Sequence, residues 1–227
     1  MSGNPIENVG VVAGYDLWAA DYDALDNPLV ALASYAIAER APRLAGVRVI
    51  ELGCGTGRHA APILGAGAAS YLGVDVSAGM LARARARPLD ARARWLNAPI
   101  EDVDAARCGS FDVVLFSLVL EHMASLDGAF RAARAVAAQP ATLRAFELHP
   151  ALHARGTRAH FRAGDRELAL PSYAHDEAEL AAALAGAGWS VEAVTTWFAP
   201  PSLTAGRPKL ARYAGVPMML EVAASVL

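Results

Sequence analysis

The stretch Arg48–Leu64, RVIELGCGTGRHAAPIL, decides the fold of this chain. An apolar run ends in the acid Glu51, and three glycines, Gly53, Gly55 and Gly57, then alternate with other residues before a helical pattern begins. Glycine lets the backbone approach a ligand closely, and the N-terminus of the following helix supplies free N–H groups. The stretch therefore predicts a nucleotide-like ligand bound where a strand passes into a helix.

The spacing of the glycines narrows the choice of ligand. A dinucleotide fingerprint is G-x-G-x-x-G and closes on a pyrophosphate, whereas here the pattern is G-x-G-x-G with Glu51 two residues before Gly53. A carboxylate so near a pyrophosphate would repel it, so a nicotinamide-dependent oxidoreductase is a weaker alternative. A P-loop is excluded because no Gly-Lys-Ser/Thr follows. The acid favours a ligand that carries positive charge.

The rest of the chain alternates apolar runs of strand length with helical patterns, which is typical of parallel βαβ units. The expected strands are 47–52, 71–76, 92–97, 111–118, 142–148, 190–198 and 217–227, and the expected helices between them are 59–65, 78–87, 126–138 and 175–189. We expect an α/β fold: a Rossmann-like, mostly parallel seven-stranded sheet with helices on both faces and an antiparallel last strand.

Three further segments complete a single domain over residues 1–227. Residues 1–46 form a helical N-terminal extension, in which Asn27 is placed to cap a helix and Pro28 to occupy its first position. Residues 149–173 are irregular and are expected to hold a short hairpin. Residues 199–216 are long for a loop in a compact domain, so they indicate a binding role or an additional short helix. Both irregular segments are candidates for the substrate site.

Composition excludes several classes of partner. With 227 residues, 55% of them hydrophobic, the chain can bury one sizeable core, and its net charge of −3 gives no positive field for nucleic acid. Although arginines crowd residues 81–94, their spacing favours a solvated helix face. The apolar run 113–120 is too short to span a bilayer, and two cysteines fit a reducing compartment. We expect a cytoplasmic protein, monomeric or homodimeric, with a small-molecule partner.

The motif ELGCGTG resembles motif I of the class I S-adenosylmethionine-dependent methyltransferases, in the branch similar to the ubiquinone and menaquinone methylases. The resemblance implies that the acid and the glycine loop hold the amino-acid end of S-adenosylmethionine (SAM), whose ammonium and sulfonium are cationic. The implied residues are Glu51, Gly53, Cys54, Gly55, Thr56 and Gly57. Because no base accompanies Cys54 in the motif, its expected role is packing within the turn.

Three later motifs resemble that family in the same order. GVDVSAGML implies Asp75 on the ribose hydroxyls, although Asp75 has the alternative role of capping the next helix. LNAPIEDV puts an asparagine, Asn97, where the family often has an adenine-binding aspartate, and LFSLVLEHM places residues under the sulfonium. The remaining implied cofactor residues are Val76, Met80, Ala98 and Ile100 around the adenine, and Phe116, Ser117 and Leu118 near the sulfonium.

The N-terminal YDLWAADYD resembles the opening of the same branch. Tyr15, Trp18 and Tyr22 fall on one face of a helix, and each carries a polar group, which favours an aromatic lid on the cofactor over a purely apolar stripe. The resemblance implies that this lid closes on the cofactor and excludes water.

Two histidines are the candidates for a general base, His122 after the fourth strand and His149 after the fifth. His149 and His153 have the spacing of two metal ligands on a helix, but a third ligand of suitable spacing is missing, so no metal is expected. The sequence thus predicts SAM-dependent transfer of a methyl group to an oxygen, nitrogen or carbon of a small molecule. A non-catalytic SAM-binding protein is the alternative, because cofactor motifs do not prove an acceptor site.

Overall fold

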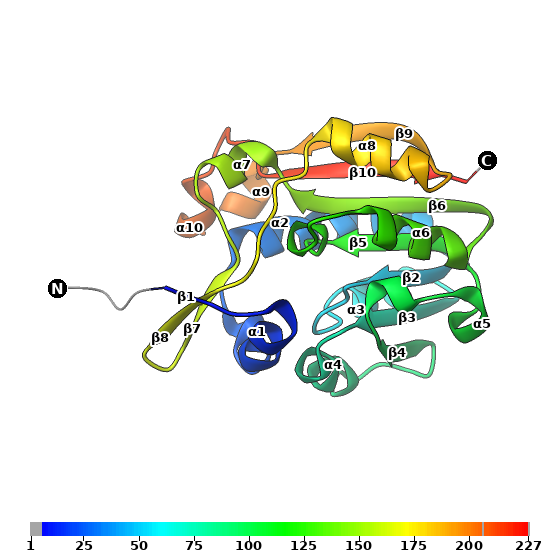
Figure 1. The fold of residues 1–227 in the computed structure, drawn as a ribbon, viewed down its shortest axis with the longest axis horizontal. Coiled ribbons are helices and arrows are strands. Elements are labelled where there is room, and N and C mark those ends of the chain that lie inside the picture. Colours follow the sequence, from blue (N-terminus) through cyan, green and yellow to red (C-terminus); the bar gives the residue numbers. More distant parts are fainter. Residues whose placement is uncertain (1–5, 206, 227) are drawn as a thin grey trace.

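The central element of the structure is a seven-stranded sheet with the order β4-β3-β2-β5-β6-β10-β9 (Figure 1). The structure, a computed structural model, describes residues 6–205 and 207–226. The strands are β2 (Arg48–Leu52), β3 (Ser70–Asp75), β4 (Ala93–Asn97), β5 (Phe111–Ser117), β6 (Ala137–Leu148), β9 (Ser190–Trp197) and β10 (Met219–Ser225). Strands β2 to β6 pair in parallel, whereas β10 is antiparallel to β6 and to β9. The predicted fold class is confirmed.

Helices cover both faces of this sheet (Figure 1). On one face lie α6 (Asp127–Val136) and α8 (Glu177–Gly186), and on the other lie α2 (Pro28–Arg40) and α3 (Ala60–Gly65). Successive side chains of a strand point to opposite faces, so Ile50 and Leu52 enter the first core cluster and Val49 enters the second. Burial on both faces explains why β2 and β5 are almost continuously apolar in sequence.

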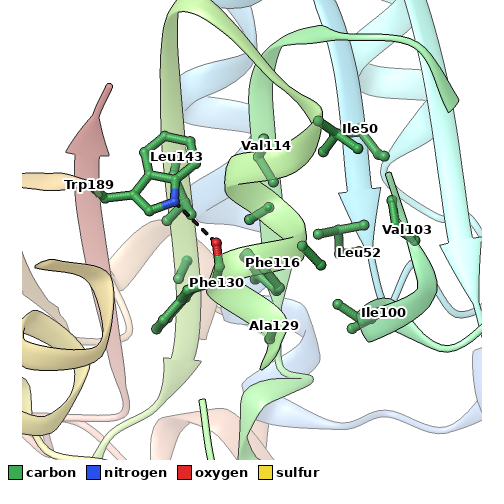
Figure 2. Packing of buried hydrophobic residues seen from close by; sticks show 14 of the residues in the cluster. Ile50, Leu52, Ile100, Val103, Val114, Phe116, Ala129, Phe130, Leu143 and Trp189 are labelled. Carbon is green, nitrogen blue, oxygen red and sulfur yellow. Dashed lines mark hydrogen bonds between the residues drawn. The ribbon is translucent and has the colours of Figure 1, made fainter. Parts of the chain in front are cut away.

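Phe130 of α6 lies at the centre of the first cluster (Figure 2). Its ring meets that of Phe116 edge-to-face, with the centroids 5.7 Å apart. The indole Nε1 of Trp189 donates to the Phe130 carbonyl at 3.3 Å, so the residues after α8 are tied to α6. Helix α6 therefore packs between the sheet and the segment that follows α8.

The helix starts follow from the capping residues. The side chain of Asn27 accepts from the amides of Leu29 and Val30, with Pro28 at the first position of α2, as predicted. Asp176 accepts from the Glu179 amide at 2.8 Å and caps α8, which lies within the predicted helix 175–189. Helix α4 (Ala78–Arg85) begins at Ser77, whose hydroxyl accepts from the Met80 amide.

A second, three-stranded sheet stands beside the N-terminal helix α1 (Val11–Trp18) (Figure 1). The expected hairpin within residues 149–173 is present as β7 (His160–Ala163) and β8 (Arg166–Ala169), preceded by a short helix α7 (Pro150–Ala154). Strand β1 (Glu7–Asn8) pairs with β8, a contact that the sequence pattern does not indicate. The N-terminal segment is thereby joined to an insertion far along the chain.

The largest difference from the predicted boundaries is at the start of β6. Strand β6 begins at Ala137, which pairs with Phe111, so the helix before it ends at Val136 and residues 137–141 are strand. Residues 199–216, which were open between loop and helix, contain two short helices in their described part. The remaining elements are η1 (Tyr22–Ala24), η2 (Ala41–Leu44), η3 (Ile100–Asp102), α5 (Ala105–Cys108), η4 (Leu120–His122), α9 (Pro201–Thr204) and α10 (Pro208–Ala211).

Candidate functional site

A cavity of about 240 Å³ lies at the carboxyl ends of β2, β3 and β5, where open α/β sheets bind ligands. Fourteen of the site residues predicted from the sequence line it: Tyr15, Tyr22, Glu51, Gly53, Cys54, Gly55, Thr56, Asp75, Val76, Met80, Ile100, Ser117, Leu118 and His122. Six others are not among its lining residues: Trp18, Gly57, Asn97, Ala98, Phe116 and His149. Most of the predicted set is therefore brought together at one place.

All three glycines of the loop have positive φ angles, but the space around them differs. A Cβ on Gly53 would lie 2.4 Å from Val119, and one on Gly57 would lie 2.3 Å from Trp95. A Cβ on Gly55 would meet no atom within 4 Å. Gly53 and Gly57 thus allow close packing, and only Gly55 presents bare backbone to open space in the cavity.

Asp75, at the end of β3, holds the glycine loop. Its carboxylate accepts from the amide of Gly55 at 2.7 Å and from the amide of Ser77 at 2.9 Å. Burial raises the pKa of Asp75, while the two amide donors oppose that rise. Asp75 is not the cap of α4, the alternative role considered for it, because Ser77 occupies that position and its own hydroxyl makes the capping bond. Each carboxylate oxygen retains a lone pair for a further donor.

Glu51 is buried and already has two protein partners. His59 contacts it through Nδ1 at 2.8 Å, and the Tyr71 hydroxyl donates to its other oxygen. His59 also lines the cavity, and its Nε2 lies 3.4 Å from the Ser34 hydroxyl. The sequence did not indicate His59 as a site residue, since its contact with Glu51 depends on how α3 follows the loop.

One side of the cavity is apolar, lined by Val76, Met80, Pro99 and Ile100. Asn97 lies outside it, and its amide nitrogen donates to the carbonyls of Asp75 and Val76 at 2.9 Å. In this structure Asn97 thereby joins the ends of β3 and β4, and its predicted contact with adenine stays a prediction. Ala98 and Phe116 belong to the core cluster below, which explains why they do not reach the cavity.

The thiol of Cys54 is buried, and burial raises its pKa well above the ordinary value. A thiol that stays protonated is a poor nucleophile. The side chain packs with Leu81, Ala84 and Trp95, in agreement with the expected packing role.

The segment 11–24, which we name the lid segment after its predicted role, contributes aromatic side chains to the lining of the cavity. Tyr15 and Tyr22 line the cavity, whereas Trp18 stacks on Phe161 of β7 with the ring centroids 4.7 Å apart. Trp18 therefore packs the lid segment against β7, and its indole Nε1 is buried without a hydrogen-bond partner. Burial raises the pKa of Tyr15 well above its ordinary value and that of Tyr22 to about 12, so both hydroxyls stay neutral.

Carboxylates of the lid segment bind the residues that surround the cavity. Asp16 accepts from the Ser77 hydroxyl at 2.6 Å and from the Gly79 amide at 2.9 Å. Asp23 accepts from Thr56 of the glycine loop at 2.8 Å, and it also pairs with Arg58 and Arg87. The lid segment is thus fixed to both the glycine loop and the start of α4.

Two arginines of the run 81–94 take part in this attachment. Arg83 donates to the carbonyls of Ala19 and Ala20, and Arg87 donates to the Thr56 carbonyl. The expectation of a merely solvated helix face is wrong for these two side chains. They pair with protein groups, which gives them a role without nucleic acid.

His122 connects three segments of the chain. Its Nδ1 lies 2.7 Å from the Pro171 carbonyl, which only accepts, so Nδ1 carries the proton and Nε2 is free to accept. The Tyr15 hydroxyl donates to Nε2 at 2.7 Å. His122 therefore has the tautomer of a potential base, with a neutral hydroxyl already placed on its free nitrogen.

His149 directly follows β6, where the sequence placed it, but it is not among the residues that line the cavity. Its Nδ1 accepts from the Ala151 amide and caps α7, so in the neutral ring the proton lies on Nε2. Burial lowers the pKa of His149. With its basic nitrogen occupied, and away from the residues that line the cavity, His149 does not have the geometry of a general base there.

The described residues, 6–205 and 207–226, hold neither a metal-binding cluster nor a membrane-spanning helix. Within them, no group of three or more His, Cys, Asp and Glu side chains is arranged to hold a metal ion. Within the same residues, no helix combines the length and the apolar character that crossing a bilayer requires.

Residues 49–139 match a family model that is described as a methyltransferase domain. The ubiquinone biosynthesis O-methyltransferase of Bordetella pertussis is 33% identical over 103 residues, which are 44% of this chain and 42% of that protein. The chain thus spans less than half the length of this curated relative.

Solved structures share the fold over most of the chain. An S-adenosylmethionine-dependent methyltransferase from Mesorhizobium loti has a TM-score of 0.69 at 23% identity and covers 85% of this chain and 97% of its own. A magnesium protoporphyrin IX methyltransferase from Synechocystis PCC 6803, with S-adenosylhomocysteine (SAH) bound, has a TM-score of 0.66 at 18% identity and covers 95% and 94%. The predicted resemblance is confirmed: residues 49–139 match a methyltransferase domain within a methyltransferase-like fold.

The lining of the cavity suits SAM. Gly55 leaves open space at the loop, Glu51 and Asp75 offer carboxylates to positive and hydroxyl groups, and the apolar side can accept a flat base. The one arginine among the described lining residues, Arg58, pairs with Asp23, so it does not offset the two carboxylates. The residues present therefore fit the cofactor.

The different reasons for the three glycines predict different mutant behaviour. Gly55→Ala should cost about 1 kcal/mol of stability, the price of a left-handed alanine, and should weaken SAH binding because its methyl group enters the cavity. Gly57→Ala should destabilise the free protein further, because its methyl group meets Trp95. Urea unfolding and calorimetric titration with SAH measure both effects; equal stability losses in the two variants would contradict this assignment.

Proposed function

We propose that this protein is an enzyme that transfers a methyl group from SAM to an oxygen, nitrogen or carbon of a small molecule. The observation that carries the proposal is the joint lining of one cavity by the open glycine Gly55, the carboxylates Glu51 and Asp75, and the lid tyrosines. SAM supplies an electrophilic methyl group on a sulfonium. The protein then has to bind it, exclude water and align an acceptor.

The residues divide this work by position. The loop from Gly53 to Gly57, together with Glu51 acting with His59, would hold the amino-acid end. Asp75 would accept the ribose hydroxyls through its remaining lone pairs, and the apolar side with Val76, Met80 and Ile100 would hold the adenine. The lid segment, with Tyr15 and Tyr22 over the cavity, would keep water out.

His122 is the base that we propose for acceptors that must lose a proton. The acceptor would give its proton to the Tyr15 oxygen while the Tyr15 proton passes to Nε2 of His122, so the phenol stays neutral throughout. The raised pKa of Tyr15 agrees with this relay, because burial opposes a phenolate. His149 has no part in this proposal, for the geometric reason given above.

The proposal is tested first by ligand binding and labelled transfer. Calorimetry should show binding of SAM or SAH and none of NAD, and incubation of the protein with methyl-labelled SAM and cell extract should label a small molecule. Binding of NAD in place of SAH would refute the assignment. Binding of SAH without any labelled product, across extracts from several growth conditions, would favour the non-catalytic alternative.

Asp75→Ala should weaken SAH binding by on the order of tenfold to a hundredfold, the loss expected for charge-assisted hydrogen bonds. The dissociation constant from calorimetry measures it. Asp90→Ala is the matched control, because Asp90 is an exposed carboxylate that pairs with Arg92, and the dissociation constant of this variant should equal that of the wild type. An unchanged constant for Asp75→Ala would remove this residue from the site.

His122→Asn should lower turnover about a hundredfold, the smaller end of what general-base catalysis contributes, while the affinity for SAH changes little. Tyr15→Phe should have a similar effect if the proton passes through the phenol. His149→Asn is the control: asparagine is also a good helix cap, so folding and turnover should both be kept. If His122→Asn kept full activity with the acceptor that the labelling experiment identifies, His122 would not be a general base. Catalysis would then depend only on the alignment of the acceptor with the methyl group.

A further inference from the structure

The turn after β5, residues 117–122, forms part of the wall of the cavity beside the glycine loop, and its backbone is strained. Leu118 has φ of 53°, and no other non-glycine residue in the described part of the chain has a positive φ. A left-handed conformation is unfavourable for leucine, and such residues persist only where the surroundings hold them. Ser117, Leu118, Val119 and His122 of this turn line the cavity.

A buried carboxylate holds this turn from below. Glu147, the residue before the last of β6, is only 4% exposed. One of its oxygens accepts from the Val119 amide and the other from the Leu120 amide, both at 3.2 Å. The two bonds fix the residues immediately after the strained Leu118, whose own amide donates to the Phe146 carbonyl.

The turn in its held position touches the glycine loop. The side chain of Val119 occupies the space where Gly53 would have a Cβ, with its Cγ2 2.4 Å from that point. The same turn continues into η4, which carries His122. A shift at Val119 would therefore move both the support of Gly53 and the nitrogen that faces Tyr15.

We propose that Glu147 is a positioning residue that holds the 117–122 turn against the glycine loop and thereby sets the shape of the cofactor cavity. The expected effect of Glu147 on SAH binding rests on the proposed function. The contact between the 117–122 turn and the glycine loop does not. Burial raises the pKa of Glu147 to about 8, against the opposing effect of the amides, so the group changes charge near neutral pH. Above that pH both oxygens of Glu147 can accept hydrogen bonds from the Val119 and Leu120 amides. Below it, one of the two oxygens carries a proton.

Hydrogen exchange of the full-length protein without ligand tests the contact. In Glu147→Gln the side-chain NH₂ faces one of the two amides, so residues 117–122 and 52–57 should exchange about tenfold faster, the effect of one lost hydrogen bond. Residues 190–197 of β9 should be unchanged. Faster exchange in 117–122 without any change in 52–57 would overturn the proposed link to the glycine loop.

Two further variants separate positioning from loss of folding. Glu147→Asp keeps the charge but is too short to reach both amides, so it gives the same exchange test if the glutamine variant does not fold. Glu192→Gln is the control, because Glu192 is an exposed carboxylate of β9, outside the turn and outside the glycine loop. Its exchange in residues 52–57 should match the wild type, and a change as large as in Glu147→Gln would overturn the assignment to Glu147.

The dependence of SAH affinity on pH gives the second readout. The wild type should bind SAH more tightly as the pH rises from 7 to 9, relative to Glu147→Gln measured in parallel. Glu121 of η4 and Tyr15 of α1 are the titratable groups in electrostatic contact with Glu147, and the pKa of Tyr15 lies well above this range. If the SAH affinities of the wild type and of Glu147→Gln changed with pH in the same way, the proposed effect of Glu147 on SAH binding would be overturned. If the wild type did not bind SAH, the proposed function would fail, and the exchange result would still decide the contact.

Discussion

The hydrogen bonds from the amides of Gly55 and Ser77 to the Asp75 carboxylate are the interaction on which the site depends. They join the loop after β2 to the start of α4, so the ends of two adjacent parallel strands act as one surface. That surface is rigid because β2 and β3 are buried on both faces. The cost of burying Asp75, seen in its raised pKa, is offset by those same donors.

A second set of charges fixes the lid segment over this surface. Asp16 reaches the start of α4, and Asp23 reaches Thr56 in the glycine loop. Trp18 stacks on Phe161 in the small sheet, while β1 extends that sheet. Ligand cavity, lid segment and insertion are thus connected through side chains whose partners are far apart in sequence. A hydrophobic surface alone would not fix the segment in one orientation, whereas hydrogen bonds have direction.

Much of this could be predicted because the signals are local. Alternating apolar runs placed the strands, Asn27 and Asp176 marked helix starts, and the spacing of glycines after Glu51 located the cavity. What each side chain contacts is less local. Asn97 and Phe116 were placed by their position within motifs, yet Asn97 bonds to backbone carbonyls and Phe116 faces the core. Motif position fixes where a residue stands along a strand, but neighbouring strands decide what its side chain meets.

By itself the sequence determined the parallel sheet, the ends of its helices and the presence of a glycine loop with an acid on each side, because these depend on residues close together in the chain. Only the tertiary structure decided that His59 binds Glu51, that His122 lies between Tyr15 and Pro171, and that Glu147 holds the turn at Leu118. Those contacts join residues up to 107 positions apart. They form only when the sheet brings its strand ends to one edge, which no local pattern encodes.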